Sequence, residues 1–311
     1  MYQGRLWIFR GNIGRFKRRI AFILILVFSL INIAKSETVK LNNLKIKPED
    51  LKKTFNPVAN KFNQKTITAI IIDAGHGGKD PGSIGINKIK EKDIVLSFSL
   101  ELKEELKKML PNVDIVLTRD KDTYPTLQER YKIANTAAKI ETDKPENALF
   151  ISVHANASLS PSAKGFEAYF ITAQESSEYA RAVSMLENSA LVKFDKIDAS
   201  KYEENSSQLT HNYMLVEQYQ KESRSLAQSI VDEVYKVSGI SKRNKPVQNA
   251  LFYVLKGSIM PSTLIEIGFI TNEEDAKFMN TKETRIKMVK ATALGIKKFI
   301  KEFEDTKGFS E

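Results

Sequence analysis

Between residues 66 and 305, two kinds of hydrophobic pattern follow one another along the chain. Short runs of β-branched and apolar residues are typical of buried strands, and longer stretches with apolar residues at helical spacing predict amphipathic helices. Strands are expected at 66–72, 114–118, 149–153, 165–171, 251–254 and 262–267, and helices at 92–108, 127–139 and 284–303. This alternation predicts an α/β fold, with a mostly parallel twisted sheet of about six strands and helices on both faces.

One long stretch interrupts the alternation, between the fourth and the fifth predicted strand. It contains about 80 residues, far more than a single crossover connection needs. Helical patterns at 174–191 and 208–238 flank a polar segment, DKIDASKYEENSS. We therefore expect residues 174–245 to form a helical insertion within one domain that spans residues 67–305.

The first 36 residues have the order of a secretory signal peptide. A basic segment ends at Arg19, a largely apolar run of 15 residues covers 20–34, and Ala34-Lys35-Ser36 follows. This run is shorter than the about 20 residues that a membrane-spanning helix needs. We predict a signal peptide at 1–36, with an uncleaved N-terminal membrane anchor as the alternative, and a polar linker at 37–66.

The net charge of +10 belongs mostly to that leader. The chain has 48 Lys and Arg and 38 Asp and Glu, and residues 1–36 contain seven basic side chains and no acidic one. Without them, 41 basic and 38 acidic residues leave a net charge of +3. A nucleic-acid partner is therefore disfavoured. Because cysteine is absent, any metal would have to be held by histidines and carboxylates.

Two of the three histidines stand directly after predicted strands. His76 follows the first strand and His154 the third, so both imidazoles are expected over the edge of the sheet where ligands gather. Glu91 opens the first long helix, and Glu266 lies near the end of the last strand. Two histidines and one carboxylate are typical of catalytic zinc, and a carboxylate that is not a ligand is what such a site needs as general base. His211 stands in no motif and is expected to be structural or exposed.

Seven segments together resemble the zinc-dependent N-acetylmuramoyl-L-alanine amidases. They occur in that family's order and spacing over residues 67–303: IIIDAGHGGKDPGSIG, EKDIVL, LTRDKD, LQERYKIAN, FISVHANAS, GFEAYF and PSTLIEIGFITNEED. The resemblance implies that His76, Glu91 and His154 bind Zn²⁺ and that Glu266 is the catalytic carboxylate. Water activated by zinc would attack the lactyl carbonyl attached to L-alanine in peptidoglycan, and Glu266 would pass a proton to the leaving amine.

Further residues of these motifs are expected to support the site. Asp73 and Asn156 are candidates for orienting the histidines or contacting substrate. The glycines around His76 are expected to let the backbone come close to the metal. Arg119 and Arg130 also match family positions, but an ion pair that holds the fold explains Arg130 equally well, so neither is placed in the catalytic set.

The segment 174–245 resembles the additional helical segment of the division-associated amidases of Gram-negative bacteria. There, such a segment covers the zinc cleft until a partner protein pulls it away. The resemblance implies autoinhibition by a carboxylate at the open zinc position, with Glu187, Glu203 and Glu204 among the candidates, and relief by an activator protein. It also favours export to the periplasm and a role in cell separation. The alternatives for the segment are a wall of the substrate groove or a mobile loop.

Two other functions compete with the amidase interpretation. A zinc peptidase that cuts another amide of the stem peptide would use a similar set of residues. A metal-free wall-binding regulator on the same fold would be expected to lack a histidine or the catalytic glutamate. All four residues are present here, which disfavours the regulator.

Overall fold

The computed structural model describes residues 66–140, 147–172, 175–196 and 219–306. The predicted signal peptide and nearly all of the linker lie outside these residues, as do Glu203, Glu204 and His211. Within the described part of the chain, no helix has the length and apolar character needed to cross a membrane.

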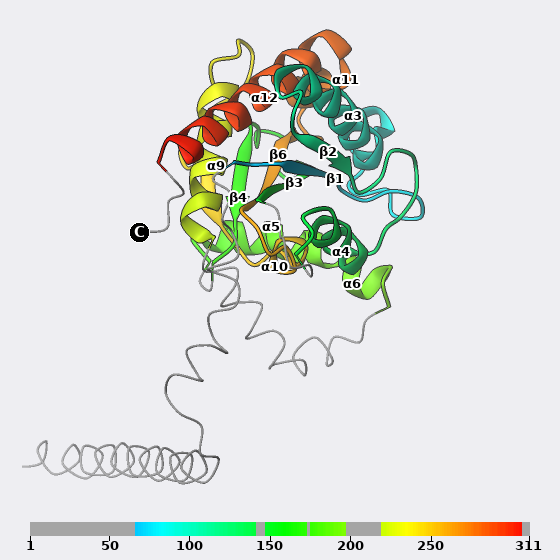
Figure 1. Ribbon diagram of the computed structural model, residues 1–311. Coiled ribbons are helices and arrows are strands. Elements are labelled where there is room, and N and C mark those ends of the chain that lie inside the picture. Colours follow the sequence, from blue (N-terminus) through cyan, green and yellow to red (C-terminus); the bar gives the residue numbers. More distant parts are fainter. Residues whose placement is uncertain (1–65, 141–146, 173–174, 197–218, 307–311) are drawn as a thin grey trace, which may run out of the picture. The chain divides into compact units, whose positions relative to one another are not determined.

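A six-stranded sheet forms the centre of the domain (Figure 1). Its order is β2 (Asp114–Leu117), β1 (Ala69–Ala74), β3 (Ala148–Asn156), β6 (Ser262–Phe269), β4 (Glu167–Phe170) and β5 (Val247–Asn249). Only the β4–β6 pair is antiparallel. All six residues of β1 and all nine of β3 are buried, as expected for central strands covered on both faces.

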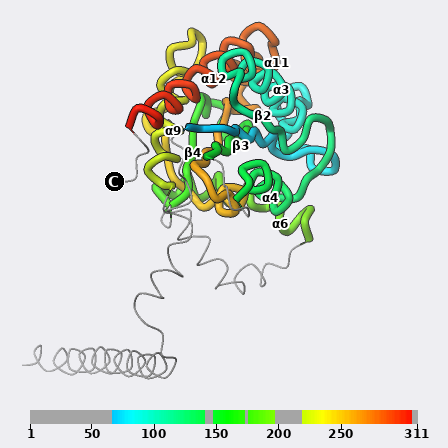
Figure 2. Tube along the Cα trace, in the orientation of Figure 1, coloured from blue at the N-terminus to red at the C-terminus, as the bar shows by residue number. Residues whose placement is uncertain are grey.

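Helices cover both faces of the sheet. Figure 1 shows α3 (Glu91–Met109), α9 (Gln220–Val234), α11 (Glu273–Asn280) and α12 (Lys282–Asp305) on one side. The other side carries α4 (Leu127–Ala137), α5 (Glu178–Asn188), α6 (Ala190–Lys193) and α10 (Tyr253–Lys256); the trace in Figure 2 shows α4 and α6 opposite α3 and α12. A short 3₁₀ helix, η1 (Ile86–Lys88), precedes α3. The predicted α/β fold is confirmed.

Local sequence explains where the main helices begin and which face they bury. In α3, Phe98, Leu102 and Leu106 recur every four residues and are fully buried against the sheet. Helix α4 begins with a capping box, because the Thr126 side chain accepts from the backbone N–H of Glu129 and the Glu129 carboxylate accepts from that of Thr126.

Two expectations about the second half of the chain need revision. The predicted strand at 251–254 is wrong: the strand beside β4 is β5 at Val247–Asn249, and α10 begins at Tyr253. A short apolar run such as LFYV does not by itself distinguish a strand from a buried helical turn. Helix α9, which falls in the predicted insertion, packs with α12 and β4 in the main core. Helix α5 also contributes Ala180 and Val183 to a hydrophobic core cluster.

A fully buried ion pair lies at the end of β1. Asp73 accepts hydrogen bonds from Thr118 Oγ1 (2.6 Å), Ser152 Oγ (2.7 Å) and Arg130 Nη1 (2.8 Å). Burial alone would raise the pKa of Asp73, but the charge of Arg130 and these hydrogen bonds outweigh burial and lower it. The pair therefore joins β1, β2, β3 and α4 at the edge where His76 follows.

We expect the Arg130→Met substitution to lower the free energy of unfolding by about 3–5 kcal/mol, because it leaves the Asp73 carboxylate buried without its cation. Chemical denaturation of the two proteins measures this change. Lys132→Met on the same helix removes an exposed cation and serves as the control. Equal decreases in the free energy of unfolding of the two variants would show that the buried Asp73–Arg130 pair contributes no more to stability than an exposed cation.

Candidate metal centre

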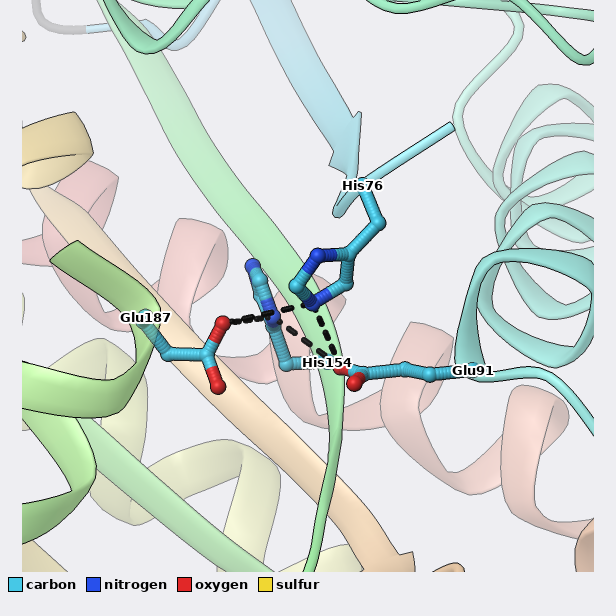
Figure 3. Close-up of side chains that lie close together, drawn as sticks. All are labelled: His76, Glu91, His154 and Glu187. Carbon is cyan, nitrogen blue, oxygen red and sulfur yellow. Dashed lines mark hydrogen bonds and ion pairs between the residues drawn. The ribbon is translucent and has the colours of Figure 1, made fainter. Parts of the chain in front are cut away.

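Four side chains meet above the carboxyl ends of β1 and β3 (Figure 3). One ligand atom from each of His76, Glu91, His154 and Glu187 lies within 4.8 Å of the other three. His76 Nε2 is 3.0 Å from Glu91 Oε1 and 3.3 Å from Glu187 Oε2. His154 Nδ1 is 3.2 Å from Glu91 Oε1 and 2.9 Å from Glu187 Oε2. Two imidazole nitrogens and two carboxylates form a set that suits a tetrahedral cation such as zinc.

The loop after β1 holds His76 in one orientation. The residue has a positive φ of 57°, and its Nδ1 lies 2.8 Å from Asp80 Oδ2. A carboxylate that accepts from Nδ1 leaves Nε2 free to face the other three side chains. Asp80 was not among the candidates from sequence, although it stands four residues after His76 in the same motif.

Glu91 is fixed by backbone donors at the start of α3. Its Oε2 accepts from the backbone N–H of Ser83 (2.9 Å), and its Oε1 accepts from that of Ala155 (3.0 Å). Ala155 directly follows His154, so one carboxylate ties the α3 terminus to β3. The structure thus brings together the three predicted ligands.

Arg119 and Arg130 hold the same loop through its carbonyl groups. Arg119 donates to the carbonyls of Ala74 (2.9 Å) and Gly75 (2.7 Å). Arg130 donates to those of Ala74 (2.6 Å) and His76 (2.7 Å). Both arginines are buried and act on the backbone that carries a candidate ligand, in agreement with leaving them outside the catalytic set.

Two glycines leave space for the candidate ligands. A Cβ at Gly75 would lie 2.5 Å from the His154 ring, and a Cβ at Gly82 would lie 2.7 Å from Glu91 Oε2 and from His76 Cδ2. Gly82 also has a positive φ of 66°, which side chains rarely adopt. The short glycine-rich motif is therefore needed for the close approach of these residues.

Helix α5 brings Glu187 to the site. Ser177 caps the helix by accepting from the N–H of Ala180 and donates to Gln248 Oε1 (2.9 Å). At the other end, Asn188 Nδ2 donates to the carbonyl of Leu251 (2.7 Å), and its Oδ1 accepts from the N–H of Tyr253 (2.8 Å). Because Asn188 is the neighbour of Glu187, these contacts fix the depth at which the carboxylate enters.

Glu266 lies on β6, beside His154 in the strand register, and is fully buried. Neither of its carboxylate oxygens has a hydrogen-bond partner in the described residues. Burial, together with the charge of Glu187, raises its pKa well above the usual range. Such a side chain can take up and release a proton next to the candidate ligands.

Carboxylates surround the two imidazoles and raise their pKa values. Burial lowers the pKa of His154, but the carboxylates of Glu187 and Glu91 outweigh it and raise the value to about 10. The pKa of His76 is likewise raised, chiefly by Glu91. The pocket therefore favours positive charge, whether from protons or from a divalent cation.

The two residues predicted to assist the site lie elsewhere than expected. Asp73 binds Arg130, Thr118 and Ser152, and so supports the sheet and the loop. Asn156 Nδ2 donates to Tyr179 Oη (2.9 Å) and to Glu167 Oε2 (3.3 Å). Glu167 stands opposite Glu266 in the antiparallel β4–β6 pair. Sequence reasoning missed Glu167, although it lies in the GFEAYF segment.

Comparison with known proteins decides the family. Residues 70–298 match the family model described as N-acetylmuramoyl-L-alanine amidase. The chain belongs to this family. The amidase AmiA of Escherichia coli K12 is 31% identical over 282 residues, which cover 90% of this chain and 88% of AmiA. The amidase AmiC of Neisseria meningitidis is 28% identical, over 81% of this chain and 57% of its own length.

Solved amidase structures share the fold. AmiC2 of Nostoc punctiforme is 28% identical with a TM-score of 0.52, covering 76% of this chain and 98% of AmiC2. The CwlD amidase of Clostridioides difficile, solved in complex with the GerS lipoprotein, is 24% identical with a TM-score of 0.53, covering 76% of this chain and 99% of CwlD. This amidase is thus a peptidoglycan hydrolase with the six-stranded α/β fold of its family.

We expect Gly75→Ala to weaken zinc binding by about 10–100-fold, as is usual when the surroundings of a metal ligand are disturbed, because the new methyl group displaces the His154 ring. Titration with Zn²⁺ against a chromogenic chelator measures the affinity. The thermal midpoint without metal separates loss of the site from loss of the fold. Unchanged zinc affinity would show that His154 does not depend on this close approach.

Proposed function

We propose that His76, Glu91 and His154 hold Zn²⁺ in this amidase, that Glu266 is its general base and acid, and that Glu187 blocks the site until α5 moves. The observation that carries the proposal is the convergence of two imidazoles and two carboxylates beside a buried glutamate without partners. The ligand atoms also favour zinc as the metal, because zinc prefers histidine nitrogens and carboxylate oxygens that converge on one point.

When bound, Zn²⁺ supplies Lewis acidity, which lowers the pKa of water toward about 7 and stabilises negative charge on the carbonyl oxygen under attack. Glu266 takes the proton of the attacking water, for which its free oxygens and its raised pKa are suited. It then delivers a proton to the nitrogen of L-alanine as the amide breaks. The products are a stem peptide with a free amine and a glycan with a free lactyl carboxylate.

Glu187 and its helix leave no room for substrate. The cavity lined by His76, His154, Glu187 and their neighbours has a volume of about 10 Å³, enough for about one water molecule. Glu187 enters from the side opposite Glu91 (Figure 3). The carboxylate therefore stands where a substrate carbonyl or water would have to bind, which supports an inhibited state.

Polar contacts after α6 hold this segment against the loop that precedes α4. The Asp195 carboxylate accepts from Tyr124 Oη (2.6 Å) and from the N–H of Leu127 (3.1 Å) at the start of α4. Lys79 Nζ donates to the carbonyl of Phe194 (2.8 Å). Each of these hydrogen bonds stabilises the attachment of the segment only modestly, so a protein partner that offers similar hydrogen bonds can replace them.

The outward side of the segment carries three large apolar side chains among its charged residues. Met185, Leu186 and Val192 have 62%, 44% and 58% of their surface exposed. Large exposed apolar side chains on a blocking helix suit a protein partner that draws the helix away. On the family resemblance, we place this activation in the periplasm during cell separation, with export by the segment at 1–36 and peptidoglycan as substrate.

Glu266→Gln is expected to lower the rate of stem-peptide release by about 10²–10⁴-fold while zinc content stays the same, because a general base is lost without a ligand. The assay digests purified peptidoglycan and identifies the products by mass, with Glu187→Gln as the background so that self-blocking does not hide activity. Free peptides that begin at L-alanine support the amidase. Shortened peptides still attached to sugar would assign a peptidase instead.

Glu187→Gln is expected to raise the basal hydrolysis rate without any partner, since the neutral amide is a poorer ligand than the carboxylate. Glu178→Gln, at the exposed start of the same helix, is the matched control and leaves the rate unchanged. Asp195→Asn, which weakens the hold on α6 but keeps Glu187, should give a smaller increase. Equal basal rates in all four proteins would exclude autoinhibition by this segment.

A further inference from the structure

A second cavity lies at the same edge of the sheet, beyond β4. It has a volume of about 600 Å³, within the usual range for ligand pockets. Cations dominate its lining, and no carboxylate belongs to it. The lining residues are Ser162, Lys164, Ser177, Tyr179, Lys242, Arg243, Asn244, Lys245 and Gln248.

The walls of this basic cavity are well ordered by buried contacts. Arg243 forms an ion pair with the buried Glu167, and its guanidinium lies 5.1 Å from the ring centres of both Tyr179 and Phe269. The backbone N–H of Arg243 donates to Tyr235 Oη (2.9 Å). One wall is therefore fixed to the core, while Lys242 and Lys245 extend from it into solvent.

Tyr179 and Glu167 lie between the basic cavity and the strand of Glu266. Tyr179 lines the cavity, and its hydroxyl donates to Glu167 Oε2 (2.7 Å). Glu167 in turn stands opposite Glu266 in the sheet. Because β4 separates β6 from β5, the cavity is two strand spacings, or about 10 Å, from the strand of Glu266. An extended peptide of three residues spans about the same distance, roughly 10 Å.

We propose that the basic cavity binds a carboxylate of the stem peptide while the lactyl–alanine amide lies at the metal centre. This inference rests on the proposed function. The stem peptide starts at the scissile amide and carries free carboxylates farther along, so its charge and its reach match the cavity. Lys242 and Lys245 attract the carboxylate, and the ion pair between Arg243 and Glu167 holds the cavity wall in place.

The test measures binding of a defined peptide to the full-length protein loaded with Zn²⁺. The probe is the free tripeptide L-alanyl-γ-D-glutamyl-meso-diaminopimelate, followed by amide chemical-shift changes at residues 242–248. The double variant Lys242→Gln/Lys245→Gln removes two cations from the cavity. Lys290→Gln/Lys301→Gln removes two exposed cations from α12 and serves as the matched control.

The cavity variant is expected to bind the tripeptide about three- to tenfold more weakly, as for two partly exposed charge contacts, while the control binds as the native protein does. The peptide with its carboxylates converted to amides should bind the native protein about as weakly as the unmodified peptide binds the cavity variant. No binding by the native protein, equal binding by the cavity variant, or equal binding of the amidated peptide would overturn the proposal. Inorganic phosphate that matched the peptide's affinity would show a general anion site and also overturn it.

This readout does not depend on hydrolysis. A Glu187→Gln protein that binds the tripeptide in the cavity but releases no stem peptide from peptidoglycan contradicts the proposed function alone. A protein that digests peptidoglycan but binds the tripeptide independently of Lys242 and Lys245 contradicts only the basic cavity as a substrate site.

Discussion

Buried negative charge is the constraint around which this edge of the sheet is organised. Glu91, Glu187, Glu266 and Glu167 are all at most 8% exposed, and two of them, Glu91 and Glu187, lie against both imidazoles. Carboxylates this close in a dry environment are tolerated only when positive charge or a proton offsets them. Arg243 supplies that charge for Glu167, and Glu266 responds to the carboxylates around it with a raised pKa. For Glu91 and Glu187, the proposed divalent cation between the imidazoles would satisfy both at once.

The scaffold around this charge is rigid where the ligands are placed and weakly attached where Glu187 is placed. His76 and Glu91 are held by buried arginines, glycine turns and backbone donors, all anchored in central strands. Glu187 comes from a helix whose buried apolar side chains are Ala180 and Val183 and which exposes Met185 and Leu186. Local stability differs in this way when one element must stay fixed and another must move. The proposed displacement of α5 would therefore require no change in the geometry of the other candidate ligands.

The sequence was sufficient for the parts that depend on short-range pattern. Strand-length apolar runs with His76 and His154 directly after them predicted both the parallel sheet and the edge at which ligands meet, since strand ends of a parallel sheet share one side. The sequence was insufficient where contacts between distant segments decide which residues form a strand or reach the site. The strand at Val247–Asn249 was misplaced because the neighbouring run at 251–254 is more apolar, although it forms the turn into α10. Glu187 could be named only as one of several carboxylates, because nothing local in α5 shows that Asn188 docks on residues 251–253.

Tyr179 would connect the proposed inhibited state with the proposed substrate site in the basic cavity. Its hydroxyl donates a hydrogen bond to Glu167, and its ring packs against the guanidinium of Arg243. The helix that carries Glu187 therefore also forms one wall of the basic cavity. One helix carries both Tyr179 and, two turns later, Glu187. Movement of α5 would therefore remove Tyr179 from Glu167 and Glu187 from the candidate metal centre at the same time. It would also widen the basic cavity toward Glu266. A stem peptide that bridged the two places would then compete with α5 for both. Substrate and blocking helix would thus be alternative occupants of one continuous surface, and the affinity of each would limit that of the other.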